Sequence, residues 1–443
     1  MPLDEGVVVI EAISGGRLAA QLRLWRERAL LTQEELARTT GLGVRTIRRL
    51  ESQVDRRPRS ESLRLLVAAL NLNDDEKAQL VSAGQPPRLG ERAPWQLPRD
   101  LHGFIAREPE LTILDSCRPG LAVISGTAGV GKTSLALHWA HRVAATFPDG
   151  NLYVNLRGFD PKSAPLEPAT VLPAFLTALG VERQSIPLEP EAQVALYRST
   201  IAGKQILIVL DNAYSSQQVR PLLPVAASAT VVVTSRNRLA GLAVTDNARL
   251  VSLGLLATEQ ARRLLALRLG QDRVAAEPHA ANEIAALCAG LPLALAVAAA
   301  RATAEPALTL GALAAQLRDT GQRLDALELD EDDDATDVRA VFCWSYRHLE
   351  PPAARLFRLL GAHPQAEIAV PAAAGLGGLT APAAEALLQD LVSAHLVEEA
   401  SPGRYLMHDL LRLFAREQTV STLVRRGYAS WPARPGPRPV GAG

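Results

Sequence analysis

The pattern of apolar and polar positions divides the chain into a helical beginning and an alternating middle. Between residues 17 and 83, apolar side chains such as Leu18, Leu22 and Trp25 recur every three or four positions, which predicts helices. After residue 100, short apolar runs alternate with amphipathic stretches, a pattern typical of a parallel sheet with helices on both faces. We expect strands at 122–124, 152–155, 205–211, 230–236 and 249–253.

Two further helical regions follow the alternating part. Residues 255–318 keep the helical period, and residues 338–346 open another helix. The most apolar stretch, 285–300, is interrupted by Gly290 and Pro292 and is shorter than the roughly 20 residues that cross a bilayer. We interpret it as a buried helix pair, and we expect no membrane partner.

Residues 31–51 predict two short helices joined by a tight turn. Thr32 and Glu35 form a capping box that starts the first helix, and Gly41 ends it. The second helix opens directly after the turn and reaches Glu51. Two short helices joined in this way form a helix-turn-helix.

The second of these helices carries the candidate DNA-binding side chains. Ile47 and Leu50 face the core, so the remaining positions face outward. In a helix-turn-helix the second helix lies in the major groove of DNA. The candidate DNA-reading residues are Arg45, Thr46, Arg48 and Arg49.

Charge supports this interpretation locally. The chain has zero net charge, yet eleven arginines and only five acidic residues lie between residues 17 and 59. Such a surplus is the electrostatic footprint of phosphate binding. A helical module that binds protein through a solvated basic face is the alternative. The segment resembles the Cro/repressor-type helix-turn-helix, and this resemblance implies that Gln33 contacts the DNA backbone.

The stretch Gly126–Thr133 fits the pattern G-x-x-x-x-G-K-[ST] at every fixed position. It follows an apolar strand and precedes an amphipathic run, which is the context of a P-loop. Its backbone N–H groups converge on phosphate oxygens, and the following helix adds its positive N-terminal end. Lys132 is expected to reach the β- and γ-phosphates, and Thr133 to ligate Mg²⁺. The candidate nucleotide-binding residues here are Gly126, Gly129, Val130, Gly131, Lys132, Thr133 and Ser134.

The apolar strand that ends at Asp211 predicts the second half of this site. A carboxylate at that position holds Mg²⁺ directly or through water. Motor-like P-loop ATPases place a second acid beside it, whereas this chain has Asn212. An amide cannot act as a general base, so we expect at most a slow ATPase. At the end of the next strand, Arg236 is placed to reach a γ-phosphate. Lys132, Asp211 and Arg236 are therefore the candidate catalytic residues.

Six motifs in order along the chain carry a resemblance to a known family. They are FIARE at 104–108, the P-loop, the Asp211 strand, TSR at 234–236, CAGLPL at 288–293 and MHD at 407–409. This series resembles the NB-ARC class of STAND signalling ATPases, which includes plant disease-resistance proteins, apoptosome activators and bacterial regulators. The chain departs from the family at Ala106, where a glycine is usual, and at Asn212.

The resemblance implies roles for residues far from the P-loop. Arg107, in the segment before the P-loop, and Pro292 are expected to contact the adenosine. Arg236 is expected to sense the γ-phosphate, and His408 to contact the β-phosphate of ADP. The resemblance also implies a helical lid and a winged-helix domain after the nucleotide domain.

The predicted fold class is therefore multidomain. An all-α helix-turn-helix domain precedes an α/β P-loop NTPase domain with a parallel sheet, and a helical lid and a winged-helix domain follow. The predicted bounds are helix-turn-helix 17–83, a proline-rich linker 84–100, P-loop domain 101–254, lid 255–324, acidic linker 325–335, winged helix 336–417 and a disordered tail 418–443.

Cysteine usage and the N-terminus bear on the compartment. Cys117, Cys288 and Cys343 match no disulfide or metal spacing, and the N-terminus lacks the features of a signal peptide. We therefore expect a cytoplasmic protein. No internal repeat that would form a sensor array is visible.

These observations predict a transcriptional regulator that binds double-stranded DNA and is switched between ADP and ATP, with Mg²⁺. Expected partners are a homo-oligomer formed in one nucleotide state and a separate sensor protein. Two alternatives remain open. One is a signalling scaffold whose N-terminal helices bind protein, and the other is a true ATP-hydrolysing machine.

Overall fold

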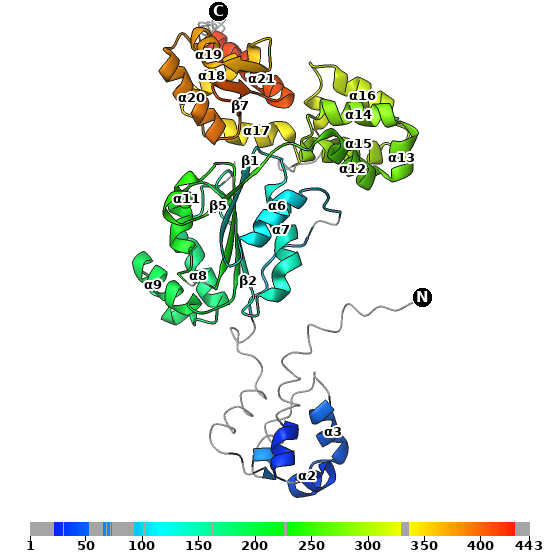
Figure 1. Cartoon of the computed structure of the whole chain (residues 1–443), viewed down its shortest axis with the longest axis vertical. Helices are drawn as coiled ribbons and strands as arrows, with labels where there is room; N and C mark the ends of the chain where they lie inside the picture. The colour runs from blue at the N-terminus through cyan, green and yellow to red at the C-terminus, as the bar shows by residue number, and fades with distance from the viewer. Residues whose placement is uncertain are drawn as a thin grey trace, which may run out of the picture. The chain divides into compact units, whose positions relative to one another are not determined.

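The computed structural model describes most of the chain and separates it into two compact units, 1–92 and 93–443 (Figure 1). The described residues are 22–29, 31–52, 65–67, 69–70, 72, 93–100, 103–160, 163–225, 228–328 and 336–429. Parts of several predicted segments lie outside them, namely 17–21, 30, 53–64, 68, 71 and 73–83 of the helix-turn-helix domain, 84–92 of the linker, 101–102, 161–162 and 226–227 of the P-loop domain, 329–335 of the acidic linker and 430–443 of the tail. Within the described ranges, no helix combines the length and apolar character that a membrane crossing needs.

The first unit contains the predicted helix pair, α2 (Gln33–Thr40) and α3 (Val44–Ser52). The Thr32 and Glu35 side chains form the expected capping box, and Gly41 ends α2 in the left-handed conformation with φ 69°. Ile47 and Leu50 of α3 are buried against apolar side chains of residues 22–28 and 65–70. The capping, the turn and the inward face of α3 are therefore confirmed.

A five-stranded parallel sheet forms the centre of the second unit. Its strand order is β2-β3-β4-β1-β5, so β4 lies between the P-loop strand β1 and the Asp211 strand β3. All six residues of β4 are buried, as expected of a central strand covered on both faces. The strands are β1 (Gly120–Gly126), β2 (Asn151–Asn155), β3 (Leu207–Ala213), β4 (Thr230–Ser235) and β5 (Arg249–Leu253).

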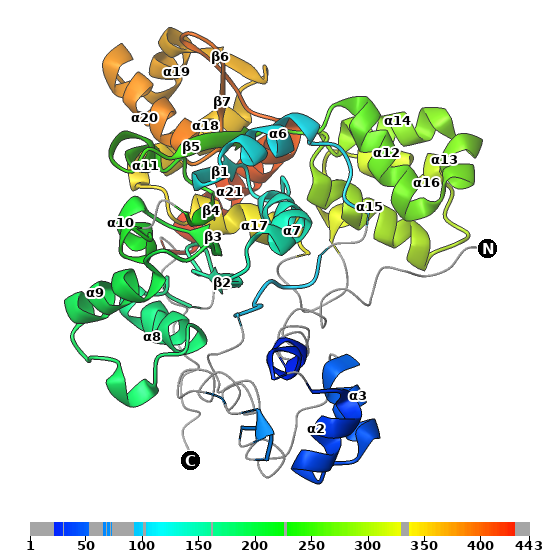
Figure 2. The same ribbon diagram turned by 60° about the horizontal axis from the view of Figure 1, so that its bottom comes forward.

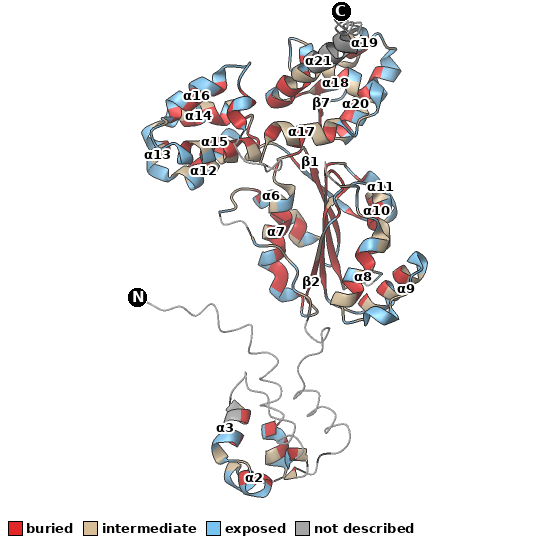
Figure 3. Ribbon diagram, turned by 180° about the vertical axis from the view of Figure 1, so that it is seen from behind, coloured by how far each residue is buried: buried red, intermediate tan, exposed pale blue. Residues whose placement is uncertain are grey.

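Helices cover both faces of this sheet (Figures 1 and 3). Because alternate strand residues point to opposite faces, the strands contribute to two separate cores. Ile124 and Val209 pack with Trp139 on one face, whereas Ile208 packs with Phe175 on the other. Helices α6 (Glu108–Ser116) and α7 (Lys132–Val143) cover the first face, and α8 (Pro168–Ala178), α9 (Pro190–Ile201), α10 (Ser216–Val219) and α11 (Ala240–Thr245) cover the second.

The last residues of the predicted linker pack on the sheet. The Asn151 N–H donates to Pro94 O at 2.6 Å, and its side-chain oxygen accepts from the N–H groups of Gln96 and Leu97. These bonds satisfy backbone groups that a free linker would leave to water. Residues 93–100 thus differ from the expected free connection and belong to the second unit.

Two segments follow the sheet (Figure 2). The helical segment, residues 255–327, contains α12 (Thr258–Leu269), α13 (Gln271–Ala276), α14 (Pro278–Leu287), α15 (Pro292–Ala304) and α16 (Leu310–Arg318). The C-terminal segment, residues 336–429, surrounds a three-stranded antiparallel sheet of order β6-β8-β7. Its elements are α17 (Val338–Tyr346), α18 (Pro351–Ala362), β6 (Glu367–Ala369), α19 (Val370–Gly377), α20 (Ala381–Ser393), β7 (Glu398–Ser401), β8 (Arg404–Leu406) and α21 (Asp409–Ala429).

Helix α21 runs past the end predicted for the winged-helix region. The sequence predicts a disordered tail from residue 418, whereas the helix continues to Ala429. Residues 409–426 contain neither proline nor glycine, so nothing in them interrupts a helix. Over 418–429 the structure therefore differs from the expected tail.

Close packing of α18 on α21 depends on Gly361. A Cβ atom at this position would overlap the Cβ of Ala415, and it would lie 3.1 Å from the backbone N of Arg416. We therefore expect Gly361→Ala to lower the free energy of unfolding by about 1–3 kcal/mol, as overpacking does. Urea denaturation followed by circular dichroism measures this loss.

The control for this variant is Gly375→Ala in α19. Its Cβ would meet open space, so helix propensity should make it neutral or stabilising by up to about 1 kcal/mol. Equal unfolding midpoints for the two variants would contradict the packing argument.

Candidate nucleotide site

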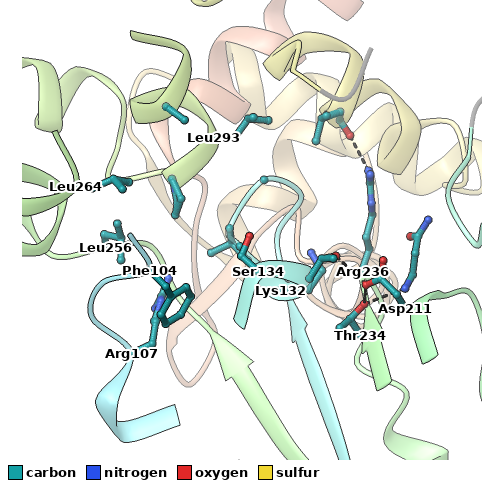
Figure 4. Close-up of a pocket in the computed structure, with 18 of the residues that line it drawn as sticks. Phe104, Arg107, Lys132, Ser134, Asp211, Thr234, Arg236, Leu256, Leu264 and Leu293 are labelled. Atoms are coloured by element: carbon teal, nitrogen blue, oxygen red, sulfur yellow. Dashed lines mark hydrogen bonds between the residues drawn. The ribbon is translucent and has the colours of Figure 1, made fainter. Parts of the chain in front are cut away.

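A cavity of about 580 Å³ lies where β1, β3 and β4 end (Figure 4). Its floor is the P-loop from Gly129 to Ser134, and Asp211, Asn212 and Arg236 form part of its wall. The helical segment contributes Leu264 and Pro292, and α17 contributes Val341 and Trp344. Residues from well-separated stretches of the chain thus surround one space.

Two glycines allow the P-loop to pass close to its neighbours. A Cβ at Gly126, where φ is 153°, would lie 2.6 Å from Leu253 O. A Cβ at Gly129, where φ is 77°, would lie 2.9 Å from the Leu293 Cβ. The Leu293 N–H also donates to Gly129 O at 3.1 Å. The P-loop is therefore fixed against the N-terminus of α15, beside Pro292.

Lys132 is partly buried, and its ammonium group has main-chain partners. Its Nζ donates to Gly126 O at 3.0 Å and to Thr127 O at 2.9 Å. Burial, followed by the positive charge of Arg236, lowers the pKa of Lys132 to about 7, against the opposing effect of Asp211. An anion placed beside this ammonium would favour its charged form. The surroundings of Lys132 therefore fit a phosphate group.

Asp211 accepts hydrogen bonds from three hydroxyl groups. Thr133 Oγ1 donates to its Oδ1 at 2.7 Å and Thr234 Oγ1 to the same atom at 2.5 Å, while the Tyr153 hydroxyl lies 3.3 Å from Oδ2. Burial, and then the charge of Asp211, raises the pKa of Tyr153, so its hydroxyl stays protonated. The structure thus brings together the two predicted Mg²⁺ ligands, Thr133 and Asp211. Hydroxyl and carboxylate oxygens suit that ion.

The sequence pattern did not identify Tyr153 and Thr234 as site residues. Thr234 begins the TSR motif and could have been found from the strand pattern, because β4 lies beside β3. Tyr153 sits in β2, where its neighbour Val154 pairs in register with Leu210. That pairing becomes visible only when the strand order is known.

Asp211 is the one carboxylate among the described residues that line the cavity. Its neighbour Asn212 has a left-handed backbone with φ 56°, and the Asn212 N–H donates to Thr234 Oγ1 at 2.9 Å. The strand register shifts at this point, between Leu210 and Ala213. The described wall therefore offers no second acid to activate water.

Arg236 extends from the end of β4 to α17, as Figure 4 shows. Its Nη1 donates to Val341 O at 2.7 Å and lies 3.2 Å from Ser345 Oγ. The guanidinium also lies over the rings of Phe159 and Trp344, at 5.3 and 5.2 Å. Burial lowers its pKa to about 10, so it remains charged at neutral pH.

The other end of the cavity is largely apolar. Phe104, Leu256 and Leu264 lie there with Leu293 (Figure 4). Arg107, predicted to contact the adenosine, lines this end, but its guanidinium donates to Gly254 O at 2.7 Å and to the carboxylate of Glu110 at 3.1 Å. A flat apolar group such as a nucleotide base fits these walls.

Known proteins resemble this chain in two ways, through a helix-turn-helix family and through longer regulatory proteins. Residues 22–77 match the helix-turn-helix family HTH_3. The chain is 38% identical over 417 residues to the regulatory protein AfsR of Streptomyces griseus, covering 93% of this chain and 40% of that protein. It is 42% identical over 380 residues to AfsR of Streptomyces coelicolor, covering 83% and 37%. The chain therefore spans about 40% of the length of these curated relatives.

Solved structures give weaker likenesses. A STAND signal-transduction ATPase with a tetratricopeptide repeat sensor from Pyrococcus horikoshii is 19% identical with a TM-score of 0.36, covering 76% of this chain and 47% of that one. A Walker-type ATPase of Pyrococcus abyssi is 13% identical with a TM-score of 0.49, covering 74% and 99%. Because these TM-scores are low, we assign the fold from the strand order and the P-loop alone.

The chain joins a helix-turn-helix to a P-loop NTPase-like domain with a parallel sheet. A P-loop that follows a central parallel strand binds nucleotide phosphate together with Mg²⁺. The P-loop domain of this chain meets that description, with Gly126–Thr133 after β1 and Asp211 at the end of β3.

His408 is not among the described residues that line the cavity of the P-loop domain. Its Nδ1 accepts from the Leu411 N–H at 3.4 Å at the start of α21, and its ring lies 5.8 Å from that of Phe342. Burial lowers the pKa of His408 to about 4, so the imidazole is neutral. The predicted β-phosphate contact of His408 therefore stays a prediction, because its ring serves the packing of α17 and α21 here.

The predicted DNA-binding side chains of the helix-turn-helix fall into two groups. Arg45 and Thr46 are exposed at the start of α3. Gln33 donates to Glu51 Oε2 at 2.8 Å, and Arg48 pairs with Glu34 at 2.8 Å and donates to Gln33 Oε1 at 3.3 Å. The Arg49 side chain lies outside the described part. Gln33 and Arg48 thus join the two helices across the turn.

Replacing Lys132 with alanine tests the phosphate end of the cavity. Because Lys132 is the ammonium closest to the P-loop carbonyls, we expect Lys132→Ala to retain less than about a tenth of the nucleotide bound by wild type. Chromatography of nucleotide released on denaturation measures the occupancy. Lys204→Ala, which changes a lysine outside the cavity wall, should retain nucleotide normally. Wild-type occupancy in Lys132→Ala would refute the site.

Proposed function

We propose that the chain is a transcriptional regulator whose helix-turn-helix binds double-stranded DNA under the control of bound ADP or ATP. The observation that carries this proposal is the contact of Arg236 with α17. Arg236 belongs to the cavity wall, and its hydrogen-bond acceptors belong to the C-terminal segment. One side chain therefore links the nucleotide cavity to another part of the chain.

The guanidinium of Arg236 cannot serve two sets of acceptors at once. Bound ATP supplies a γ-phosphate that ADP lacks. To bind that phosphate, Arg236 would leave Val341 O and Ser345 Oγ, and α17 would lose the contacts that hold it over the cavity. The two states are then a closed state with Arg236 on α17 and an open state without it. A near-complete shift between them needs a difference in nucleotide affinity of about 5.5 kcal/mol.

The segments after the sheet supply the moving parts of this proposal. We assign the lid to residues 255–324 and the winged-helix domain to 336–417, connected by the acidic linker 325–335. Arg339 of α17 pairs with Asp325 and Glu417, which connects α17 to the end of the helical segment and to α21. Release of α17 would therefore disturb ion pairs that join it to both segments.

Slow hydrolysis suits such a switch. Asn212 stands where a catalytic acid would be, and the described cavity wall provides no substitute carboxylate. We therefore propose a switch with at most slow ATPase activity, acting in the cytoplasm with a nucleotide-dependent homo-oligomer and a separate sensor protein as partners. Steady turnover that neither DNA nor partners change would favour an ATP-hydrolysing machine instead.

The proposed function can be tested through Arg236, which links the nucleotide cavity to α17. DNA sites selected from a random pool with wild-type protein should bind with different affinity after ADP loading and after ATP loading. Arg236→Ala should reduce that difference to less than about twofold, because without the guanidinium the variant cannot exchange contacts with α17 for contacts with phosphate. Fluorescence anisotropy on both loaded forms measures it, with Arg198→Ala in α9 as an exposed control. Equal DNA binding by ADP-loaded and ATP-loaded wild type would disconnect the two units.

The exposed start of α3 gives the test of DNA reading. Arg45→Ala should weaken binding to a selected site by about 1–3 kcal/mol if Arg45 contacts a base edge. Arg38→Ala, an exposed arginine on α2, serves as the matched control. If the N-terminal helices bind protein instead, wild-type affinity for DNA will be low and will lack the steep salt dependence of phosphate neutralisation.

A further inference from the structure

The segment at the start of the second unit makes contacts that the proposed function has not used. We call residues 93–100 the strap. Trp95 forms a short parallel bridge with Asn151 on β2, the edge strand of the sheet. The Asn151 side chain is buried, and its oxygen accepts from the N–H groups of Gln96 and Leu97 at 2.8 and 3.1 Å. The first half of the strap therefore continues the sheet beyond β2.

Helix α7 holds the other half of the strap. His141 Nε2 donates to Pro98 O at 2.7 Å, and His138 Nδ1 lies 3.2 Å from Asp100 Oδ2. The two histidines are three positions apart, so they share one face of the helix that begins at Lys132. The strap is thus attached to the helix that follows the P-loop.

Phe104 connects this attachment to the nucleotide cavity. Its ring stacks on the ring of His138, with the centroids 4.4 Å apart and the planes at 17°. The Phe104 side chain also lines the apolar end of the cavity (Figure 4), whereas His138 is not among the described residues that line it. A nucleotide base in that end would therefore contact Phe104, and Phe104 contacts the histidine that holds the strap.

The attachment of the strap is of a kind that a ligand can strengthen. Trp95, its largest side chain, is 58% exposed, and most of its contacts are hydrogen bonds that water can replace at little net cost. A Phe104 ring that is already held against a base loses less conformational freedom when it stacks on His138. Base binding and strap attachment then stabilise one another reciprocally.

We propose that a bound nucleotide base, acting through Phe104 and His138, fastens the strap to the nucleotide domain and so controls the connection to the helix-turn-helix. This inference rests on the proposed function and adds a second route of regulation to its site. Arg236 responds to the γ-phosphate, whereas the strap responds to the base and so to occupancy itself. Release of the eight-residue strap would lengthen the connection by up to about 26 Å.

Hydrogen exchange at the amides of Gln96 and Leu97 tests this inference in the full chain. Both amides donate to Asn151, so their exchange reports release of the strap. We expect saturating ADP to slow their exchange by about fivefold or more relative to unliganded protein. Pyrophosphate, which has no base, should change it by less than about twofold. Mass spectrometry of peptides that cover the strap measures the exchange.

Two variants of His138 separate the ring from the hydrogen bond. His138→Phe keeps a ring for Phe104 and loses the nitrogen that faces Asp100, while His138→Asn keeps a polar nitrogen and loses the ring. Because the route needs both, ADP should slow exchange by less than about twofold in either variant. Arg142→Ala is the matched control on α7, since Arg142 pairs with Asp115 instead of the strap, and its response to ADP should equal that of wild type.

The wild-type comparison decides the inference even if a variant fails to fold. Equal exchange with and without ADP, in protein that binds ADP, would show that the strap does not respond, and the proposed function would stand. Equal slowing by ADP and pyrophosphate would place the signal at the phosphate end and overturn the route through Phe104. A full ADP response in His138→Phe would likewise overturn it. Absence of ADP binding by wild type would overturn the proposed function itself.

Discussion

The buried ammonium of Lys132 is the constraint on which the site depends. Removing a charge from water is costly unless other groups replace the lost solvation. Two P-loop carbonyls do so in part, and Asp211 adds a favourable charge, while burial still lowers the lysine pKa to about 7. The site is therefore arranged to gain free energy when an anion arrives. Gly126 and Gly129 let the P-loop backbone pass close enough to its neighbours to form this site.

The proposed switch depends on the neutral groups that hold the charge of Arg236. Its charge is held by a carbonyl and a hydroxyl of α17 and by two aromatic rings, so these partners are neutral groups. Neutral acceptors hold a guanidinium less strongly than an anion does. A phosphate can therefore compete for Arg236 on favourable terms. That competition is the physical basis of the switch proposed for this chain, because α17 belongs to a different segment from β4.

The MHD motif predicts a residue but not what its side chain contacts. The MHD motif singles out His408, which the structure uses at the start of α21 and against Phe342. The predicted contact of His408 with a β-phosphate stays a prediction, because His408 is not among the described residues that line the cavity. A motif gives the residue type and its place in the chain, whereas the neighbour of the His408 ring, Phe342, comes from the packing of α17.

Local sequence determined the parts that depend on neighbouring residues. The capping box at Thr32, the turn at Gly41, the five parallel strands and the P-loop context all follow from short-range backbone preferences and apolar patterning. Only the tertiary structure decided which partners these elements meet. Strand order placed Thr234 and Tyr153 on Asp211, and packing of α17 supplied the acceptors for Arg236. Those contacts join segments distant in the chain, and a sequence pattern records what a residue can donate or accept but not which distant group reaches it.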